Sequence, residues 1–184
     1  MVSVDTGMLS LLLYPGAKPP SDPATGKPVD KAQERVEQLI DDLERAKERI
    51  IIPAPALSEF LVLAGQDGPQ YLSEISLLSN IYIQPFDQMA AIELAAMELL
   101  ARKKGNKRHP LPTTVPWQKV KLDRQIVAIT KLHQCKTIYS DDAGVRAIAE
   151  DIGIKTISTW ELAPAQSKTP LLDESGPPLP LSPK

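Results

Sequence analysis

Short apolar runs alternate with helix-like segments along this chain, and that alternation constrains its fold more than any other feature. The run Ile50-Ile51-Ile52 is continuous and β-branched, which is typical of a parallel strand buried on both faces. Strands separated by helices indicate one parallel sheet covered by helices, and hence an α/β protein. The expected strands are residues 1–5, 50–52, 81–83, 137–139 and 155–157.

Capping and breaking residues set the expected helix boundaries. Thr6 is expected to cap a first helix, and Asp30 with Gln33 to cap a second. Ser58 is expected to cap a third, and Gly153 to follow the last one. Three prolines favour irregular structure over residues 102–120, and residues 15–28 read as an exposed loop. The expected helices are 6–14, 30–47, 58–63, 71–78, 87–100, 122–133 and 142–151.

Length and composition predict one domain over residues 1–162. A chain of 184 residues, 42% hydrophobic, can bury one core. Residues 163–184 are rich in Pro, Ser and Lys without periodicity, so they are expected to be a disordered tail. No apolar run reaches the roughly 18 residues of a membrane span. The single Cys135, interpreted as a buried apolar residue, and the absence of a secretory pattern predict a cytoplasmic protein.

Acidic residues fall where the strands and helices of such a sheet meet. An open parallel sheet binds ligands beyond the carboxyl ends of its strands, at the point where the strand order reverses. Carboxylates gathered there repel one another unless a divalent cation lies between them. The sequence therefore predicts a metal-dependent nuclease site. The acids are Asp5, Glu59, Asp123 and the pair Asp141-Asp142.

The chemistry follows from the type of ligand. Carboxylate oxygens suit Mg²⁺, which keeps several waters and leaves room for a phosphate and a nucleophile. A second ion could stabilise the leaving oxygen of an in-line displacement. His109 and His133 stand alone and are expected at the surface, so no zinc site is predicted.

Each acid also has a purely structural interpretation. Asp5 could cap the first helix, and Asp142 could cap its own. Glu59 and Asp123 could be stabilised by the dipole at a helix N-terminus. The functional interpretation is favoured because all four fall at one edge of the expected sheet.

These motifs resemble the PIN-domain family of metal-dependent ribonucleases, particularly the VapC-type toxins. The resemblance covers residues 1 to about 162. It implies a three-layer PIN-like α/β fold, with a five-stranded parallel sheet flanked by helices. It also implies Mg²⁺- or Mn²⁺-dependent endonucleolytic cleavage of RNA, a homodimer, and a small antitoxin protein as partner. The matching motifs are Val4-Asp5-Thr6, the segment 52–60 ending in Glu59-Phe60, the segment 122–128 with Asp123, and Ile138-Tyr139-Ser140-Asp141-Asp142.

Carried over residue by residue, the resemblance makes Asp5, Glu59, Asp123 and Asp142 the catalytic, metal-binding acids, with Asp141 as an alternative ligand. The hydroxyls of Thr6 and Ser140 would then hydrogen-bond the carboxylates or a metal-bound water. The chain departs from the family in a longer loop after the first helix, in the 102–120 insertion, and in Ala143-Gly144-Val145 where an aromatic is common. These departures leave the RNA target and the partner open.

A basic segment precedes the third acid. Because the net charge is only −2 and the pI about 5.7, any contact with nucleic acid must come from a local patch. This segment could contact RNA phosphates, and Trp117 could stack on an unpaired base. The alternative is a solvated loop whose Trp117 packs on the domain. The basic residues are Arg102, Lys103, Lys104, Lys107 and Arg108.

Two other functions were weighed against a nuclease. The first is a catalytically inactive PIN-like module that binds RNA or a protein. The second is a phosphatase with an aspartyl nucleophile after the first strand. The phosphatase is discounted because it needs a second Asp where this chain has Gly7.

Overall fold

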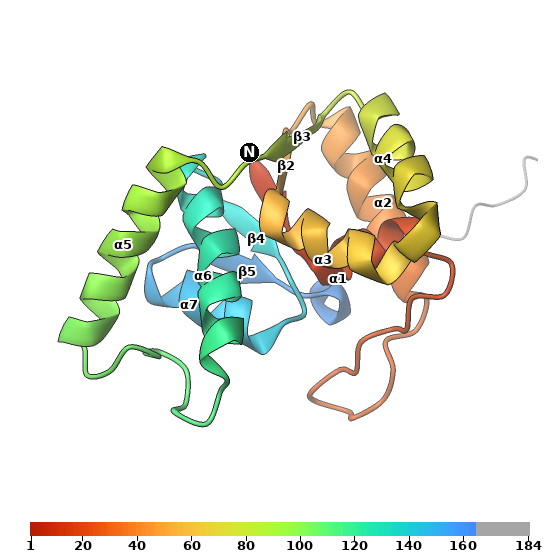
Figure 1. The fold of residues 1–184 in the computed structure, drawn as a ribbon. Coiled ribbons are helices and arrows are strands. Elements are labelled where there is room, and N and C mark those ends of the chain that lie inside the picture. Colours follow the sequence, from red (N-terminus) through yellow and green to blue (C-terminus); the bar gives the residue numbers. More distant parts are fainter. Residues whose placement is uncertain (165–184) are drawn as a thin grey trace, which may run out of the picture.

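Five parallel strands form one sheet, in the order β3-β2-β1-β4-β5 (Figure 1). The computed structural model describes residues 1–164, and the remaining residues of the expected tail, 165–184, lie outside this range. Because β2 and β3 follow on one side of β1 and β4 and β5 on the other, the strand order reverses between β1 and β4. The five expected strands are confirmed as β1 (Val2–Val4), β2 (Ile50–Pro53), β3 (Ile81–Gln84), β4 (Thr137–Tyr139) and β5 (Lys155–Ile157).

Helices cover both faces of the sheet, α1 to α4 on one side and α5 to α7 on the other (Figure 1). The expected three-layer α/β architecture, with a five-stranded parallel sheet flanked by helices, is therefore confirmed. The helices are α1 (Thr6–Leu13), α2 (Ala32–Arg45), α3 (Ala54–Ala64), α4 (Gly68–Leu77), α5 (Gln88–Lys103), α6 (Trp117–Leu132) and α7 (Ala143–Asp151), with short 3-10 turns η1 (Gly65–Asp67) and η2 (Thr159–Glu161).

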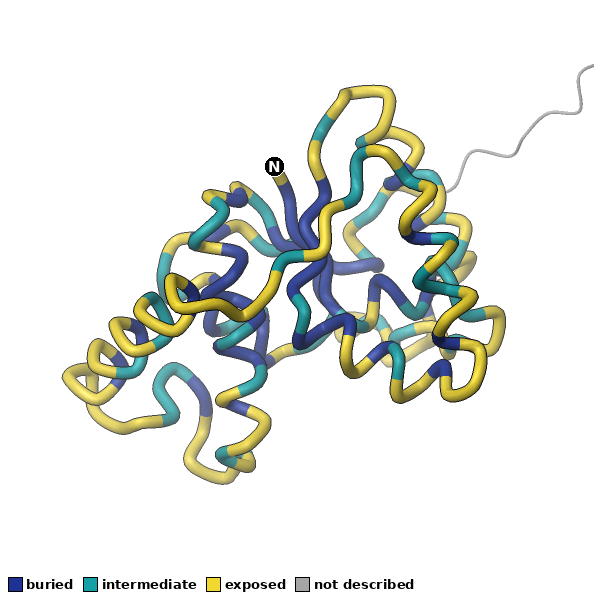
Figure 2. Tube along the Cα trace, turned by 45° about the horizontal axis from the view of Figure 1, so that its top comes forward, coloured by how far each residue is buried: buried dark blue, intermediate teal, exposed yellow. Residues whose placement is uncertain are grey.

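The side-chain alternation of the strands divides the core between the two layers. In β1 and β2, Val2, Val4 and Ile50 pack toward α1 and α2. On the other face, Ile51 packs against α5 and α6. Successive side chains of a strand point to opposite faces, so a strand buried on both faces must be apolar throughout. The central strands are accordingly buried in Figure 2.

A polar pair lies inside this apolar layer. Ser3 and Thr130 are fully buried, and their hydroxyls are hydrogen-bonded to each other at 3.0 Å, while the Thr130 hydroxyl donates to the carbonyl of Ile126. Because a buried hydroxyl without a partner is costly, this bond fixes how α6 lies across β1. Cys135 is buried beside it, as expected.

Helix α1 begins at residue 6 as expected, but its expected cap and three other expected helix starts are wrong. Asp5, and not Thr6, caps α1, because its carboxylate accepts the Met8 amide. Asp30 does not cap α2: Lys31 precedes it with φ +51° and no capping bond. Ser58 lies inside α3, which begins after Pro53 with a proline in its first turn, a favoured place for proline.

The third wrong start enlarges the site. Helix α6 begins at Trp117 after Pro116, and not at Leu122. Helix α5 also runs on to Lys103, so the irregular segment shrinks from 102–120 to 104–116. The prolines indicated a break correctly, but a proline just before a helix also starts one. Within residues 1–164, no helix combines the length and apolarity needed to cross a membrane.

The packing of α3 makes a stability prediction. Phe60 is fully buried and meets the Tyr71 ring of α4 edge-on, at 5.4 Å between centroids. We expect Phe60→Ala to lower the free energy of unfolding by about 3–5 kcal/mol, from lost burial and the remaining cavity. Urea denaturation measures this. Val62→Ala, on the same helix but 81% exposed, should cost less than about 0.5 kcal/mol. Equal losses for the two variants would contradict this packing.

Candidate active site

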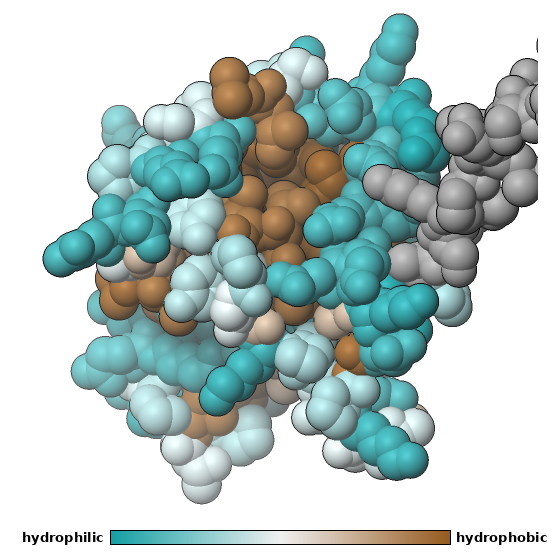
Figure 3. Space-filling view, turned by 90° about the vertical axis from the view of Figure 1, so that its right-hand side faces the viewer, coloured by the Kyte–Doolittle hydropathy of each residue, from teal (hydrophilic) through white to brown (hydrophobic). Residues whose placement is uncertain are grey.

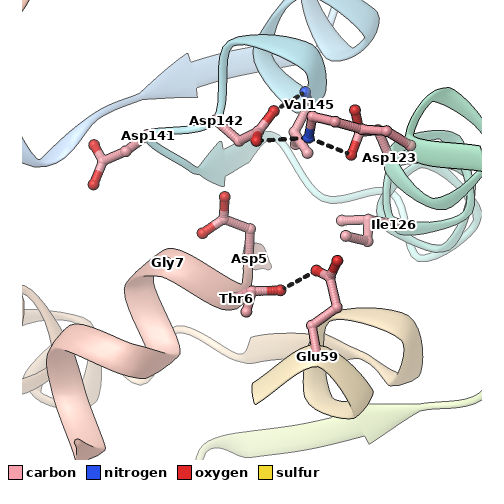
Figure 4. A pocket seen from close by; sticks show the side chains of 10 residues that line it. Asp5, Thr6, Gly7, Glu59, Asp123, Ile126, Asp141, Asp142 and Val145 are labelled. Carbon is pink, nitrogen blue, oxygen red and sulfur yellow. Dashed lines mark hydrogen bonds and ion pairs between the residues drawn. The ribbon is translucent and has the colours of Figure 1, made fainter. Parts of the chain in front are cut away.

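A cavity of about 300 Å³ opens at the carboxyl edge of the sheet, where the strand order reverses. Figure 4 shows the side chains around it. They come from the end of β1, from α3, from α6 and from the turn after β4. The structure thus brings together acids that lie as far apart as residues 5 and 142 in sequence. The acids lining the cavity are Asp5, Glu59, Asp123, Asp141 and Asp142.

Asp5 lies deepest, at 3% exposure. Its Oδ1 accepts the Met8 amide at 3.1 Å, and its Oδ2 accepts the Ser140 hydroxyl in a very short contact. Burial raises the pKa of Asp5 to about 7, and the nearby carboxylates Asp141 and Asp142 add to the rise, although both hydrogen bonds oppose it. The expected hydrogen bond between Ser140 and a site carboxylate is therefore present.

Glu59 faces Asp5 from α3, on the opposite side of the cavity (Figure 4). Its side chain is exposed, and its Oε2 accepts the Thr6 hydroxyl at 2.6 Å. Thr6 therefore touches a site carboxylate, as expected, and ties the start of α1 to α3.

Asp123 is 4% exposed, although it lies in the middle of α6. Its Oδ1 accepts from Lys119 Nζ at 3.2 Å, and its buried Oδ2 has no hydrogen-bond partner. Burial raises the pKa of Asp123 to about 6, and the charges of Asp142 and Glu59 add to the rise while Lys119 opposes it. A buried carboxylate oxygen without a partner is costly, so this oxygen needs a structural or functional explanation.

The two acids after β4 have different surroundings. Asp142 caps α7 by accepting the amides of Gly144 and Val145, and its Oδ2 accepts from Lys119 at 2.8 Å. Burial acts to raise its pKa, but the bonds from Lys119 and the helix amides leave it below the usual value. Asp141 instead accepts the amide and hydroxyl of Thr159 at 2.7 and 2.6 Å.

These contacts distinguish Asp142, the expected metal-binding acid, from Asp141, its expected alternative. The Asp141 carboxylate lies at the rim and points away from Asp123 and Glu59, whereas Asp142 lies beside Asp123 (Figure 4). Asp142 is thus better placed than Asp141 to share a ligand with the other acids.

A purely structural role, such as capping a helix, accounts for two of the four acids and not for the other two. Asp5 and Asp142 do cap helices. Glu59 and Asp123 lie in the interiors of α3 and α6, beyond the first turn, so stabilisation by a helix N-terminus does not account for them. Asp123 is also buried, and a buried acid in a helix interior needs another explanation, which the shared cavity supplies.

Sequence reasoning missed two residues that shape this site: Lys119, which lines the cavity, and Gly144, which packs against two of its acids. Lys119 was placed in an irregular segment, but it lies one turn before Asp123 on α6, at the i,i+4 spacing of a helical ion pair. Gly144 is needed because a Cβ there would lie 2.3 Å from Asp123 Oδ2 and 3.0 Å from Asp142 Oδ1. The missed indication for Lys119 was the Lys-x-x-x-Asp spacing.

The donor set fits a hard divalent cation. The acids offer only oxygen ligands, Asp123 Oδ2 lacks a partner, and Asp123 and Asp142 already share one cationic group, the Lys119 ammonium. In the described part of the chain, however, no three His, Cys, Asp or Glu side chains stand ready to hold one ion. Ser140, Thr6 and Lys119 hold these carboxylates in their present positions, so side chains must turn before three of them can share an ion.

The basic segment lies outside the cavity lining, on the end of α5 and in the loop that leads to α6. Lys104 pairs with Asp151 at 2.8 Å, and Arg108 donates to the carbonyl of Val115. Trp117 packs on the domain, as in the alternative interpretation, between Lys107 and Arg124. Phosphate binding by Arg102 and Lys103, which are exposed, and base stacking by Trp117 stay predictions.

The fold and this cavity define a class of protein: a parallel α/β domain with an acidic site at its switch point. No family model and no curated protein sequence matches the chain. Solved structures of toxin–antitoxin proteins do match it. FitAB bound to an IR36 DNA fragment gives a TM-score of 0.57 at 20% identity, covering 90% of this chain and 100% of that one.

Two further structures agree. VapBC2 from Rickettsia felis, bound to a promoter DNA fragment, gives a TM-score of 0.53 at 13% identity, covering 86% of this chain and 98% of that one. VapC20 of Mycobacterium tuberculosis, a toxin that cleaves the sarcin-ricin loop, gives 0.52 at 16% identity, covering 89% and 100%. The chain therefore has the fold of the VapC-type PIN domain, as the sequence resemblance predicted.

The burial of Asp5 makes a prediction about pH. Its pKa is about 7 in the folded protein and near 3.8 when exposed, so the folded state binds the proton more tightly. Stability should therefore fall as the pH rises from about 4 through 7. In Asp5→Asn this loss should be smaller by about 1–4 kcal/mol. Urea unfolding in EDTA between pH 4 and 8 measures it.

The control for this experiment is Asp41→Asn on the exposed side of α2, which should leave the wild-type pH dependence unchanged. If Asp5→Asn lost as much stability between pH 4 and 7 as the wild type, the assignment of this proton to Asp5 would be wrong.

Proposed function

We propose that this chain is a Mg²⁺- or Mn²⁺-dependent endoribonuclease. The observation that carries the proposal is the convergence of four acids on one cavity: Asp5, Glu59, Asp123 and Asp142. Asp5 and Asp123 are buried, and neither Glu59 nor Asp123 caps a helix. When bound there, a divalent ion would neutralise the charge that develops on a phosphodiester and supply an activated water.

The chain's own residues would hold that site in shape. Ser140 fixes the Asp5 carboxylate, and Thr6 fixes that of Glu59. The α7 amides and Gly144 set the position of Asp142 close to Asp123. Hydrogen-bonded carboxylates keep the orientation that an ion needs, and neighbours of this kind commonly contribute 10- to 100-fold to metal affinity or activity.

Two flanking loops give the cavity a surface for an extended substrate. The segments 14–31 and 104–116 both lie at the lower edge of Figure 1, where the carboxyl ends of the strands point. Arg102 and Lys103 end α5 beside the second loop and offer positive charge to a phosphate backbone. An RNA strand crossing the cavity would meet the acids at its centre and the basic residues at one side.

The proposal extends to partners and setting. FitAB and VapBC2 are toxin–antitoxin complexes, which supports a small antitoxin protein as partner, and the family resemblance supports a homodimer and a cytoplasmic setting. Apolar surface is available for such contacts. Figure 3 shows an apolar area on the face that carries α2 and α4. Near it, Leu12, Leu39 and Ile81 line a small apolar hollow between α1, α2 and the sheet.

Removal of a site acid tests the proposed chemistry. We expect Asp123→Asn, which keeps the shape of the side chain but removes its charge, to lower Mg²⁺- or Mn²⁺-dependent cleavage of single-stranded RNA by on the order of 100-fold or more. Gel assays with the purified full chain measure this. Asp41→Asn on α2 should cleave at the wild-type rate, and an Asp123→Asn protein that did so too would refute the residue assignment.

The basic end of α5 makes a separate prediction about RNA binding. If Arg102 and Lys103 each contact a phosphate, replacing both with Ala should reduce the magnitude of the negative slope of log affinity against log salt by about 1.4, at about 0.7 per contact with a single strand. Fluorescence anisotropy with Asp123→Asn protein measures this without cleavage. Lys136 and Lys155, at the opposite edge of the sheet, form the matched pair whose replacement should leave the slope unchanged.

One observation favours the second candidate, a PIN-like module that binds without cutting: Lys119 already neutralises Asp123 and Asp142. A metal titration separates the two functions. RNA affinity without any binding of Mg²⁺ or Mn²⁺ would select the binding module.

A further inference from the structure

Lys119 places its ammonium group between the two carboxylates that α6 and α7 bring to the cavity. Its Nζ donates to Asp142 Oδ2 at 2.8 Å and to Asp123 Oδ1 at 3.2 Å. Two carboxylates this close repel each other when both are ionised, unless a positive charge lies between them. Lys119 therefore stands where the proposed function requires a metal ion.

The position of Lys119 makes this occupancy reversible. It lies one turn before Asp123 on α6, and a lysine carries its charge on four flexible carbons. Its side chain is 44% exposed, against 6% for that of Asp123, so one side of it already faces solvent. The ammonium can leave the carboxylates through a change of rotamer, with the backbone of α6 unmoved.

The Lys119 ammonium leaves some carboxylate oxygens of the site without a positively charged partner. Asp123 Oδ2 is buried without a partner even with Lys119 in place, and Glu59 reaches only Thr6. A lysine offers three donors and one charge, whereas a divalent ion offers twice the charge and up to six coordination positions. The ion would thus satisfy oxygens that Lys119 does not reach, and this difference can drive the exchange.

We propose that Lys119 is an internal competitor for the divalent ion: its ammonium neutralises Asp123 and Asp142 in the metal-free protein and leaves them when the ion binds. The inference rests on the proposed function, because it concerns the same carboxylates. It follows that the ion binds more weakly than the acids alone would allow. The site then stays closed by its own lysine until the metal concentration is high enough to displace it.

Titration of the full chain with Mn²⁺ by isothermal calorimetry tests the inference without measuring cleavage. Lys119→Met removes the competitor, so we expect Mn²⁺ to bind at least about tenfold more tightly than to the wild type. The difference should persist in 1 M salt, where the screening length is about 3 Å, because the contact with the acids is direct. Heating scans provide a second readout: Mn²⁺ should raise the Tm of Lys119→Met more than that of the wild type.

Lys121→Met is the matched control, since it removes the same charge from an exposed position on the same helix. It should change the Mn²⁺ affinity less than about twofold in 1 M salt. Lys119→Gln is the second variant, chosen because it removes the charge but keeps a polar end. Circular dichroism establishes that each variant is folded.

The outcomes distinguish the inference from the function on which it rests. If wild type binds Mn²⁺ and both Lys119 variants bind it equally or more weakly, the inference is overturned and the metal site stands. If Lys121→Met tightens binding as much as Lys119→Met, a general effect of charge replaces direct competition, and the inference is again overturned. If no variant binds Mn²⁺, or if Asp123→Asn binds it as wild type does, both the inference and the proposed site are wrong.

Discussion

The parallel pairing of β1 with β4 is the contact on which the rest of this structure depends. Val4 lies opposite Tyr139, and the Asp5 amide continues the ladder by donating to the Tyr139 carbonyl at 3.2 Å. That register brings Asp5 beside Ser140, although 134 residues separate the two strand ends. Because side chains alternate along a strand, a slip of one residue would turn these groups to the opposite face. The site therefore exists only in this register.

Burial of like charges is the second constraint, and it follows from the first. The crossing of α6 over β1, fixed by the bond between Thr130 and Ser3, delivers Asp123 to the same edge. The result is a cluster in which burial raises the pKa of Asp5 and Asp123 while Lys119 holds that of Asp142 low. Such a cluster costs folding stability, and groups with perturbed pKa values in a cavity are characteristic of functional sites. A positive charge from the chain or from solution removes much of that cost.

The likeness to toxin–antitoxin structures concerns the fold alone, since the identities are 13–20%. In this structure, Lys119 and Gly144 together allow two site carboxylates to lie close to each other. The glycine lets α7 approach α6 so closely that Asp123 and Asp142 become neighbours, and the lysine then balances their charge. Both residues lie after the irregular loop 104–116.

The sequence by itself determined the five strands, their parallel arrangement and the acids at one edge, because these depend on local apolar runs and on chain connectivity. It predicted the order of the helices but misplaced the starts of α2, α3 and α6. The starts of α3 and α6 were missed because Pro53 and Pro116 were interpreted as breaks, whereas they begin helices. Only the tertiary structure decided that Asp142 rather than Asp141 faces the other acids, and that Lys119 lies between two of them. These side-chain positions depend on how α6 and α7 pack across the sheet. The pattern of apolar residues within one segment does not determine the distance between side chains of two different segments.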